Sequence, residues 1–333
     1  MAGIKALRKI QLGKEVTAGT AVAASTIWNG MGVIEDTRKI VTPEADVGLL
    51  VPPNRTYTAS LAGELAMDSV EATFEQLPYI LEGGVLKIGT GVADGPGSGK
   101  IYNYTFPEAT QNTIQTFTIE GGDNVEAEEM EYSFVSEFSI EGKGQEAIMM
   151  SATWQGRQVV VSTFTGALSI PTVEEILFGK GKVYIDDVTD DYGDTQVSNT
   201  VLEMSLKVTT GWTPVWTADG NIYFTFAKGV RPEIEMEITF EHDATSQAEK
   251  VAWRDGTSRL IQLKFQGSAL TTPGTAYTYK TLVINLAGKW TKFDKLDEQD
   301  GNDVVKGTFV AGYDPTKADV GNIIVVNELA SLP

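Results

Sequence analysis

Residues 233–240 constrain this chain most, because polar and apolar residues alternate there without interruption. Successive side chains of a β-strand point to opposite faces, so this alternation predicts a strand with one face in water and the other in a core. A second alternating run covers residues 259–266. The two runs therefore predict two half-buried strands.

The segment between these strands carries the signals of a short helix. Ser246 and Glu249 have the spacing of a capping box, so we expect the helix to begin at Ser246. Arg254 falls in the last turn, where the helix dipole favours a cation, and Gly256 can adopt the left-handed conformation that ends a helix. One helical face carries small apolar residues that we expect to be buried: Ala244, Ala248, Val251 and Ala252.

An earlier stretch repeats this layout. Residues 57–65 are strand-like, residues 74–81 predict a short helix that Gly83 and Gly84 close, and residues 85–88 predict a return to extended structure. The two units are offset by about half the chain, which indicates an internal duplication. We predict two domains, residues 1–165 and 166–333, joined by a linker at 163–172 that has little charge.

Further alternating or β-branched runs predict more strands in both halves. They cover residues 114–119, 131–140 and 147–154 in the first half, and 183–185, 201–208, 222–226, 280–290, 304–313 and 323–326 in the second, the last as an edge strand. The chain is thus predicted to be mainly β.

Composition excludes several kinds of chemistry. The chain has 333 residues, no cysteine, a single histidine (His242) and a formal charge of −19. Thiolate catalysis, disulfides and most histidine chemistry are therefore absent, and no motif has the spacing of a catalytic, metal or cofactor site. The glycine-rich run at residues 93–100 does not match a phosphate-binding loop, and the aspartates at 186–194 lack calcium-loop spacing. We expect no enzyme, no cofactor and no metal.

The negative charge and the lack of long apolar runs bear on nucleic-acid binding and on where the protein is located. A surface this negative repels phosphates, since affinity for nucleic acid comes mainly from cations that replace counterions. No apolar run is long enough to span a bilayer, and the N-terminus lacks a signal-peptide pattern, so we expect the product to stay where it is made.

Two segments are predicted to lie outside the compact body. Residues 1–30 are rich in Ala, Gly and Thr and form a partly ordered arm, or alternatively an arm that docks on a neighbouring acidic subunit. Residues 36–57 contain three prolines and predict a long loop or protruding hairpin. The apolar residues of this loop would be sticky on a monomer, so we expect another copy to cover them: Val47, Leu49, Leu50 and Val51.

The end of the chain, YTYKTLVINLAGKWTKFDKLDEQDGNDVVKGTFVAGYD, together with FEQLPYILEGG and the 36–57 loop, resembles the major tail tube proteins of long-tailed, non-contractile bacteriophages. The resemblance implies tandem β-sandwich or half-barrel domains, each with one short flanking helix. It also implies a virion protein, made in the host bacterial cytoplasm, that self-assembles into stacked rings around a channel for DNA ejection.

The implied partners follow from this resemblance. They are further copies of the chain, three two-domain chains or six chains in each ring, together with a tape-measure protein, a tail terminator and tip or initiator proteins. DNA would pass through without specific binding, and the negative charge suits that passage. One departure is that the first half lacks the charged-loop pattern of residues 293–303.

Two other functions stay open. Trp212, Trp216 and Trp290 could form a platform in a carbohydrate-binding β-sandwich module, in which case these tryptophans should be exposed and coplanar. The chain could also be another tail component of the same fold, such as a terminator, which needs one face that stops growth.

Overall fold

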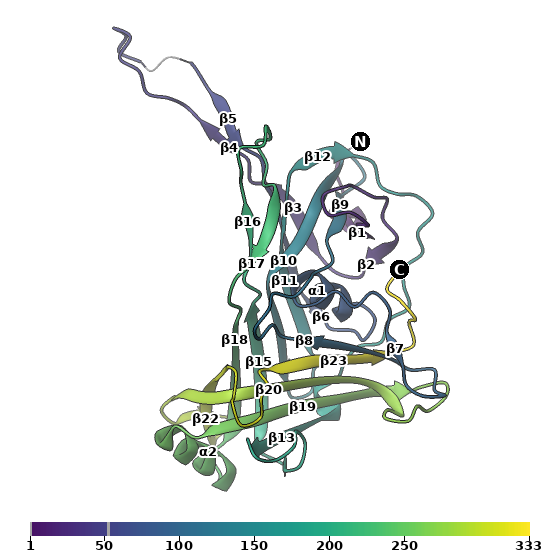
Figure 1. Ribbon diagram of the computed structural model, residues 1–333, viewed down its shortest axis with the longest axis vertical. Coiled ribbons are helices and arrows are strands. Elements are labelled where there is room, and N and C mark those ends of the chain that lie inside the picture. The colour runs from purple at the N-terminus through teal and green to yellow at the C-terminus, as the bar shows by residue number, and fades with distance from the viewer. Residues whose placement is uncertain (1, 52–53) are drawn as a thin grey trace.

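The computed structural model describes residues 2–51 and 54–333 and is mainly β, with two α-helices (Figure 1). The mainly-β prediction is therefore confirmed. In the first half, the elements are the 3-10 helix η1 (Lys5–Leu7), β1 (Lys9–Lys14), β2 (Thr26–Trp28), β3 (Gly32–Asp36), β4 (Lys39–Val41), β5 (Tyr57–Ser60), β6 (Gly63–Glu71), α1 (Leu77–Gly84), β7 (Val92–Ala93), β8 (Lys100–Thr105), β9 (Phe117–Gly122), β10 (Ala127–Lys143), β11 (Met149–Gly156) and β12 (Val159–Ser162).

The second half has a similar series of elements. They are the 3-10 helix η2 (Phe178–Lys180), β13 (Gly181–Asp187), β14 (Gln196–Val197), β15 (Val201–Thr209), β16 (Trp212–Val215), β17 (Phe226–Gly229), β18 (Glu233–Glu241), α2 (Ala244–Asp255), β19 (Ser258–Ala269), β20 (Tyr279–Phe293), β21 (Asp297–Gln299), β22 (Asn302–Ala311) and β23 (Gly321–Asn327). No helix of the described residues is long and apolar enough to cross a membrane.

Eight strands pair edge to edge in one antiparallel run, which we call the eight-strand sheet. Its order is β3, β6, β11, β10, β15, β18, β22 and the C-terminal part of β20. Apolar side chains alternate with polar ones along these strands, and the apolar row faces the core. The sheet turns strongly near its end, so that β19, β20 and β23 lie across the lower part of the molecule (Figure 1).

The pairings of the two halves match element by element. Each half begins with an antiparallel strand pair, β1–β2 or β13–β14, and continues with a second strand pair, β4–β5 or β16–β17. Each half also has one α-helix, which lies between β6 and β9 in the first half and between β18 and β19 in the second. Each also has a long strand, β10 or β20, whose N-terminal part pairs on both sides and whose C-terminal part pairs with β11 or β22. Only the first half adds β7 and β8.

The two halves share one sheet. β10 pairs with β15, and β8 pairs with β23. The predicted boundary between residues 165 and 166 falls in the irregular connection after β12, and this division stays a prediction.

The first helix is buried along its whole length because glycines let it approach the sheet. A Cβ atom on Gly83 would lie 2.8 Å from the Trp154 ring, and one on Gly84 would lie 2.9 Å from Thr210 Cγ2. Both glycines are the last residues of α1 and do not have left-handed backbones. Trp154 in turn packs edge-on against Phe117, with 5.4 Å between ring centroids. The glycines therefore allow close packing, in addition to lying at the predicted end of the helix.

The second helix differs from its prediction at the start. It spans Ala244–Asp255, and Asp243 is the N-cap residue: its carboxylate accepts from the Ser246 amide at 2.9 Å, and the Ser246 hydroxyl accepts from the Asp243 amide at 3.0 Å. Ser246 is therefore the N3 residue of the capping box, and not the N-cap residue that the sequence predicted. The helix ends as predicted, with Gly256 in the left-handed conformation.

Of the four residues predicted to form the buried face of α2, only Ala252 is buried. The buried residues of the helix are Ser246, Glu249 and Ala252, whereas Ala244, Ala248 and Val251 are exposed. The reason is that Glu249 turns toward the sheet, where it accepts from Trp290 Nε1 at 2.8 Å and from Arg259 Nε at 3.2 Å. These two hydrogen bonds offset the free-energy cost of burying the Glu249 carboxylate.

Four other expectations are corrected. The N-terminal segment predicted to be an arm is instead part of the body, because its strands β1 and β2 pair with each other, β1 also pairs with β9, and Ile10 and Leu12 are buried. Residues 85–88 form no strand, since they run as an irregular connection after α1. The strand predicted at 222–226 begins only at Phe226, as β17. The predicted edge strand at 323–326 is an inner strand, because β23 has both β20 and β8 as neighbours.

Candidate assembly surfaces

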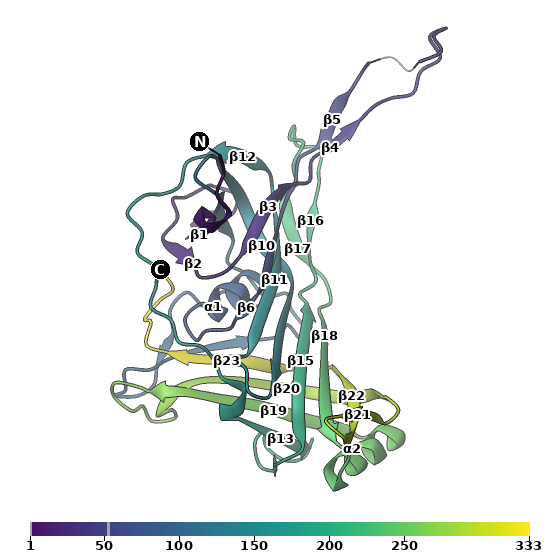
Figure 2. The same cartoon turned by 180° about the vertical axis from the view of Figure 1, so that it is seen from behind.

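The loop at residues 36–57 is a hairpin that projects far from the body (Figures 1 and 2). It starts with the ladder between β4 and β5 and extends well beyond it. The side chains singled out from the sequence are all more than half exposed: Val47, Leu49, Leu50 and Val51. Leu50 is fully exposed, whereas Pro52 and Pro53 lie outside the described residues. A contact of these side chains with another copy stays a prediction.

A second hairpin, β16–β17, rises from the eight-strand sheet toward the first (Figure 1). The Leu61 amide donates to the Ile222 carbonyl at 2.8 Å, which links the two hairpins. Arg157 fastens the second hairpin to the body, since its guanidinium donates to the Phe224 and Thr225 carbonyls at 3.0 and 2.7 Å. No local pattern in the sequence predicts that these segments, far apart in the chain, lie together.

The three tryptophans proposed as a sugar platform do not share a surface. Trp212 and Trp290 are buried, and the Trp290 indole is held by Glu249. Trp216 alone is partly exposed, and its ring packs edge-on against Phe224. A stacking platform needs several exposed rings in one plane, and this arrangement leaves one.

The solvent-facing side of the eight-strand sheet is predominantly acidic. Its acidic side chains are Glu35, Glu64, Glu71, Glu137, Glu141, Glu203, Glu233, Glu235 and Glu237. The basic side chains on that side are fewer: Lys143, Lys207, Lys289, Lys292 and Lys306. This broad face of the sheet therefore carries a net negative charge. Such a face repels polyanions over a distance set by the salt concentration.

The sheet ends in two edges that no ladder covers among the described residues. At one end, β3 pairs with β6 alone, and the side chains of Met31 and Val33 are exposed there. At the other end, the C-terminal part of β20 pairs with β22 on one side only, because its ladder with β19 stops at Lys289. Unpaired strand edges offer rows of free N–H and C=O groups to another chain.

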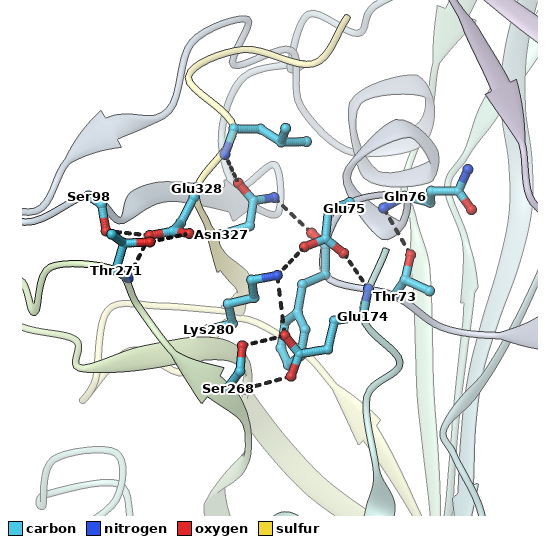
Figure 3. A network of polar contacts seen from close by, with 12 residues as sticks. Thr73, Glu75, Gln76, Ser98, Glu174, Ser268, Thr271, Lys280, Asn327 and Glu328 are labelled. Carbon is cyan, nitrogen blue, oxygen red and sulfur yellow. Dashed lines mark hydrogen bonds and ion pairs between the residues drawn. The ribbon is translucent and has the colours of Figure 1, made fainter. Parts of the chain in front are cut away.

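A polar network ties the connection between the halves to both of them (Figure 3). The Lys280 ammonium lies 2.7 Å from Glu75 and 3.2 Å from Glu174, and the Glu174 amide donates to Glu75 at 2.8 Å. Ser268 donates two hydrogen bonds to Glu174, each 2.6 Å long. Because β20 supplies Lys280 and the turn before α1 supplies Glu75, this network joins the two halves.

The same network shifts the acidities of its members. Burial alone would raise the pKa of Glu174, but the bonds from Ser268 and the charge of Lys280 outweigh it and lower that pKa. Burial also opposes the charge on Lys280, yet Glu75 and Glu174 together raise its pKa above the ordinary value. Both groups are thus held in their charged forms.

Two sequence segments that resemble ligand loops have structural partners instead. Asp94, in the glycine-rich run, is buried and accepts from the Ala276 and Tyr277 amides at 2.8 and 2.7 Å. Asp186, the first aspartate of the acidic stretch, accepts from the Gly193 and Thr195 amides. Within residues 2–51 and 54–333, no three acidic or histidine side chains are grouped as metal ligands.

Neither a scan against protein-family models nor a search of curated proteins found a match for this chain. The surfaces described above are therefore the basis for any functional inference.

Proposed function

We propose that this chain is a structural subunit that assembles into stacked rings and forms the hollow tail tube of a long-tailed, non-contractile bacteriophage. The observation that carries the proposal is the eight-strand sheet, built from two matching halves and open at two different edges. When two different edges of one molecule meet, the contact is head-to-tail, and it generates a ring if the rotation closes.

The acidic face of the sheet supports a role as the wall of a channel. If the rings place this face inward, DNA phosphates meet carboxylates along the whole passage. DNA then passes without specific binding, because a negative wall offers few cations to replace its counterions. The buried face of the sheet would lie outward and carry α1 and the remaining strands.

The projecting hairpin supports stacking of one ring on the next. Its outer part carries Val47, Leu49, Leu50 and Val51, whose exposed apolar surface leaves water when another copy covers them. The β16–β17 hairpin runs toward the same side and adds Trp216 and Ile222, both partly exposed. In this proposal the two hairpins form the axial contact between rings.

The duplication bears on the number of chains in a ring. If each half acts as one tube unit, a six-unit ring contains three chains. If the whole chain acts as one unit, the same ring contains six chains. The other partners of the proposal are a tape-measure protein, a terminator and tip or initiator proteins, each of which would meet one of these same surfaces.

Electron microscopy of the purified protein, at low and high concentration and beside its mass in solution, tests the proposal. We expect rings or hollow tubes with a central hole and threefold symmetry. Single rings that never stack would indicate a terminator instead. A monomer at every concentration, with no rings even when tails are formed in infected cells, would refute the proposal.

A further inference from the structure

We propose that the free edge of β20 pairs with β3 of the next copy, in the register that joins β10 to β15 within one chain. This inference rests on the proposed ring and names the residues that make its lateral contact. The occupant of each edge is a second copy of this chain, because the chain already contains a model of the contact.

The equivalence of β10 and β20 is exact at the level of single residues over the relevant part. A row of four paired residues crosses β3, β6, β11 and β10 in the first half, namely Ile34, Leu65, Trp154 and Val135. The matching row in the second half crosses β15, β18, β22 and β20, namely Leu206, Met236, Phe309 and Trp290. The two rows consist of buried apolar side chains.

A bulge confirms this alignment of the strands. The ladder between β10 and β11 skips one residue at Ser136, and the ladder between β20 and β22 skips one at Thr291. The Ser136 hydroxyl donates to the Thr153 carbonyl at 3.2 Å, and the Thr291 hydroxyl donates to the Thr308 carbonyl at 3.2 Å. Bulges set the register of a strand pair, so Glu137 and Lys292 are equivalent positions.

The junction inside the chain shows what an occupied edge looks like. Glu137 lies opposite Thr209, Phe138 lies opposite Val208, and Lys207 forms an ion pair with Glu137 at 3.2 Å. By the same alignment, β3 takes the place of β15, so that Thr37 corresponds to Thr209 and Glu35 to Lys207.

Applying this junction to two copies produces a complementary pair of charges. Lys292 takes the place of Glu137, and Glu35 of the next copy takes the place of Lys207, so both charges are exchanged and the ion pair is restored. Neither side chain has an interaction within its own chain that would prevent this ion pair. The Lys292 side chain is well exposed and forms an ion pair with Asp294 at 2.6 Å, and no ion pair of the described residues involves Glu35.

The exchange of charges also gives the contact a direction. If two β20 edges met in this register, they would bring two copies of Lys292 together, and two β3 edges would do the same with Glu35. Like charges at neighbouring cross-strand positions are destabilising. The contact therefore favours β20 against β3, which is the arrangement that continues around a ring.

Cysteine cross-linking tests the register directly, because the chain has no cysteine of its own. Thr37→Cys and Lys292→Cys together place two thiols opposite one another across the contact, close enough for a disulfide. We expect mild oxidation of assembled protein to give covalent dimers and larger closed species. Each single variant is expected to give none of them.

Two controls use the same chain. Glu137→Cys with Thr209→Cys reports the internal junction, and we expect an intramolecular cross-link that leaves the chain a covalent monomer. Val33→Cys with Lys292→Cys shifts the register by four residues, about 13 Å along the strand, and we expect no cross-link. Rings that cross-link only in the shifted pair, or not at all, overturn the register while the proposed tube stands. A protein that forms no rings and no cross-links overturns both.

Charge reversal gives a second measurement that does not depend on thiol geometry. Lys292→Glu or Glu35→Lys alone is expected to weaken ring formation about fivefold for each contact, and the two changes together are expected to restore it. Equal losses in the single variants with no recovery in the double variant would refute the pairing of these two residues.

Discussion

Replacing Leu49 and Leu50 with aspartate tests the axial contact of the proposed tube. Leu49 is 67% exposed and Leu50 is fully exposed, so both side chains have most of their apolar surface available to a partner. Burying a leucine is worth about 1.5–3 kcal/mol, so the pair is worth about 3–6 kcal/mol for each chain at a ring-to-ring contact. Because about 1.4 kcal/mol is a factor of ten, stacking should weaken at least about 100-fold.

The assay is the length distribution of tubes in electron micrographs, with the pelleted fraction as a second readout. We expect the double variant to form single rings or very short stacks at concentrations where the unchanged protein forms long tubes. Its free energy of unfolding should stay within about 0.5 kcal/mol, because these side chains contact little in the isolated chain.

Val16→Asp is the matched control. Val16 is 91% exposed and lies in the connection between β1 and β2, outside the hairpin at residues 36–57. A tube length that is unchanged in the Leu49→Asp, Leu50→Asp variant would refute the axial role of this hairpin. Equal shortening by Val16→Asp would show that added negative charge, and not lost apolar contact, is responsible.

Three other predictions concern stability and are checked by urea unfolding. Glu174→Gln should cost about 1–3 kcal/mol at pH 7 by weakening the bonds to Lys280 and Ser268. Since folding lowers the Glu174 pKa, its contribution is present above about pH 4.5 and is lost as the pH falls through the lowered value. The Gln variant should therefore lose less stability in acid, and equal acid sensitivity of both proteins would contradict this reasoning. Gly256→Ala should cost about 1 kcal/mol, because Gly256 has φ of 67° and an alanine there is strained, while Gly179→Ala, in open space at an ordinary φ, should not. Gly83→Ala should cost about 1–3 kcal/mol by overpacking Trp154, and an unchanged midpoint would show that α1 can shift.

Local signals in the sequence were sufficient for several elements. The alternation at residues 233–240 and 259–266 predicted β18 and β19, and Gly256 predicted the end of α2. These features depend on neighbours within a few residues, where strand periodicity and helix-cap geometry act directly. The exposed hairpin at 36–57 was predictable for the same reason, since its prolines prevent it from joining a central strand.

Features that depend on long-range partners were missed. Residues 9–14 looked like part of an arm because their burial depends on β9, more than 100 residues away. The buried face of α2 depends on Glu249 finding Trp290 and Arg259, and small apolar residues on the opposite face gave the wrong indication. A local pattern cannot report a partner that comes from a distant strand.

The sequence by itself determined that the chain is mainly β, which faces of its strands are apolar, that it carries a large negative charge, and that an apolar loop is exposed. Only the tertiary structure decided which strands are neighbours, that β23 is an inner strand, and that β3 and β20 are left with free edges. The physical reason is that side-chain alternation specifies the two faces of a strand but not its two edges. Edges are assigned by backbone hydrogen bonds, which every strand offers alike.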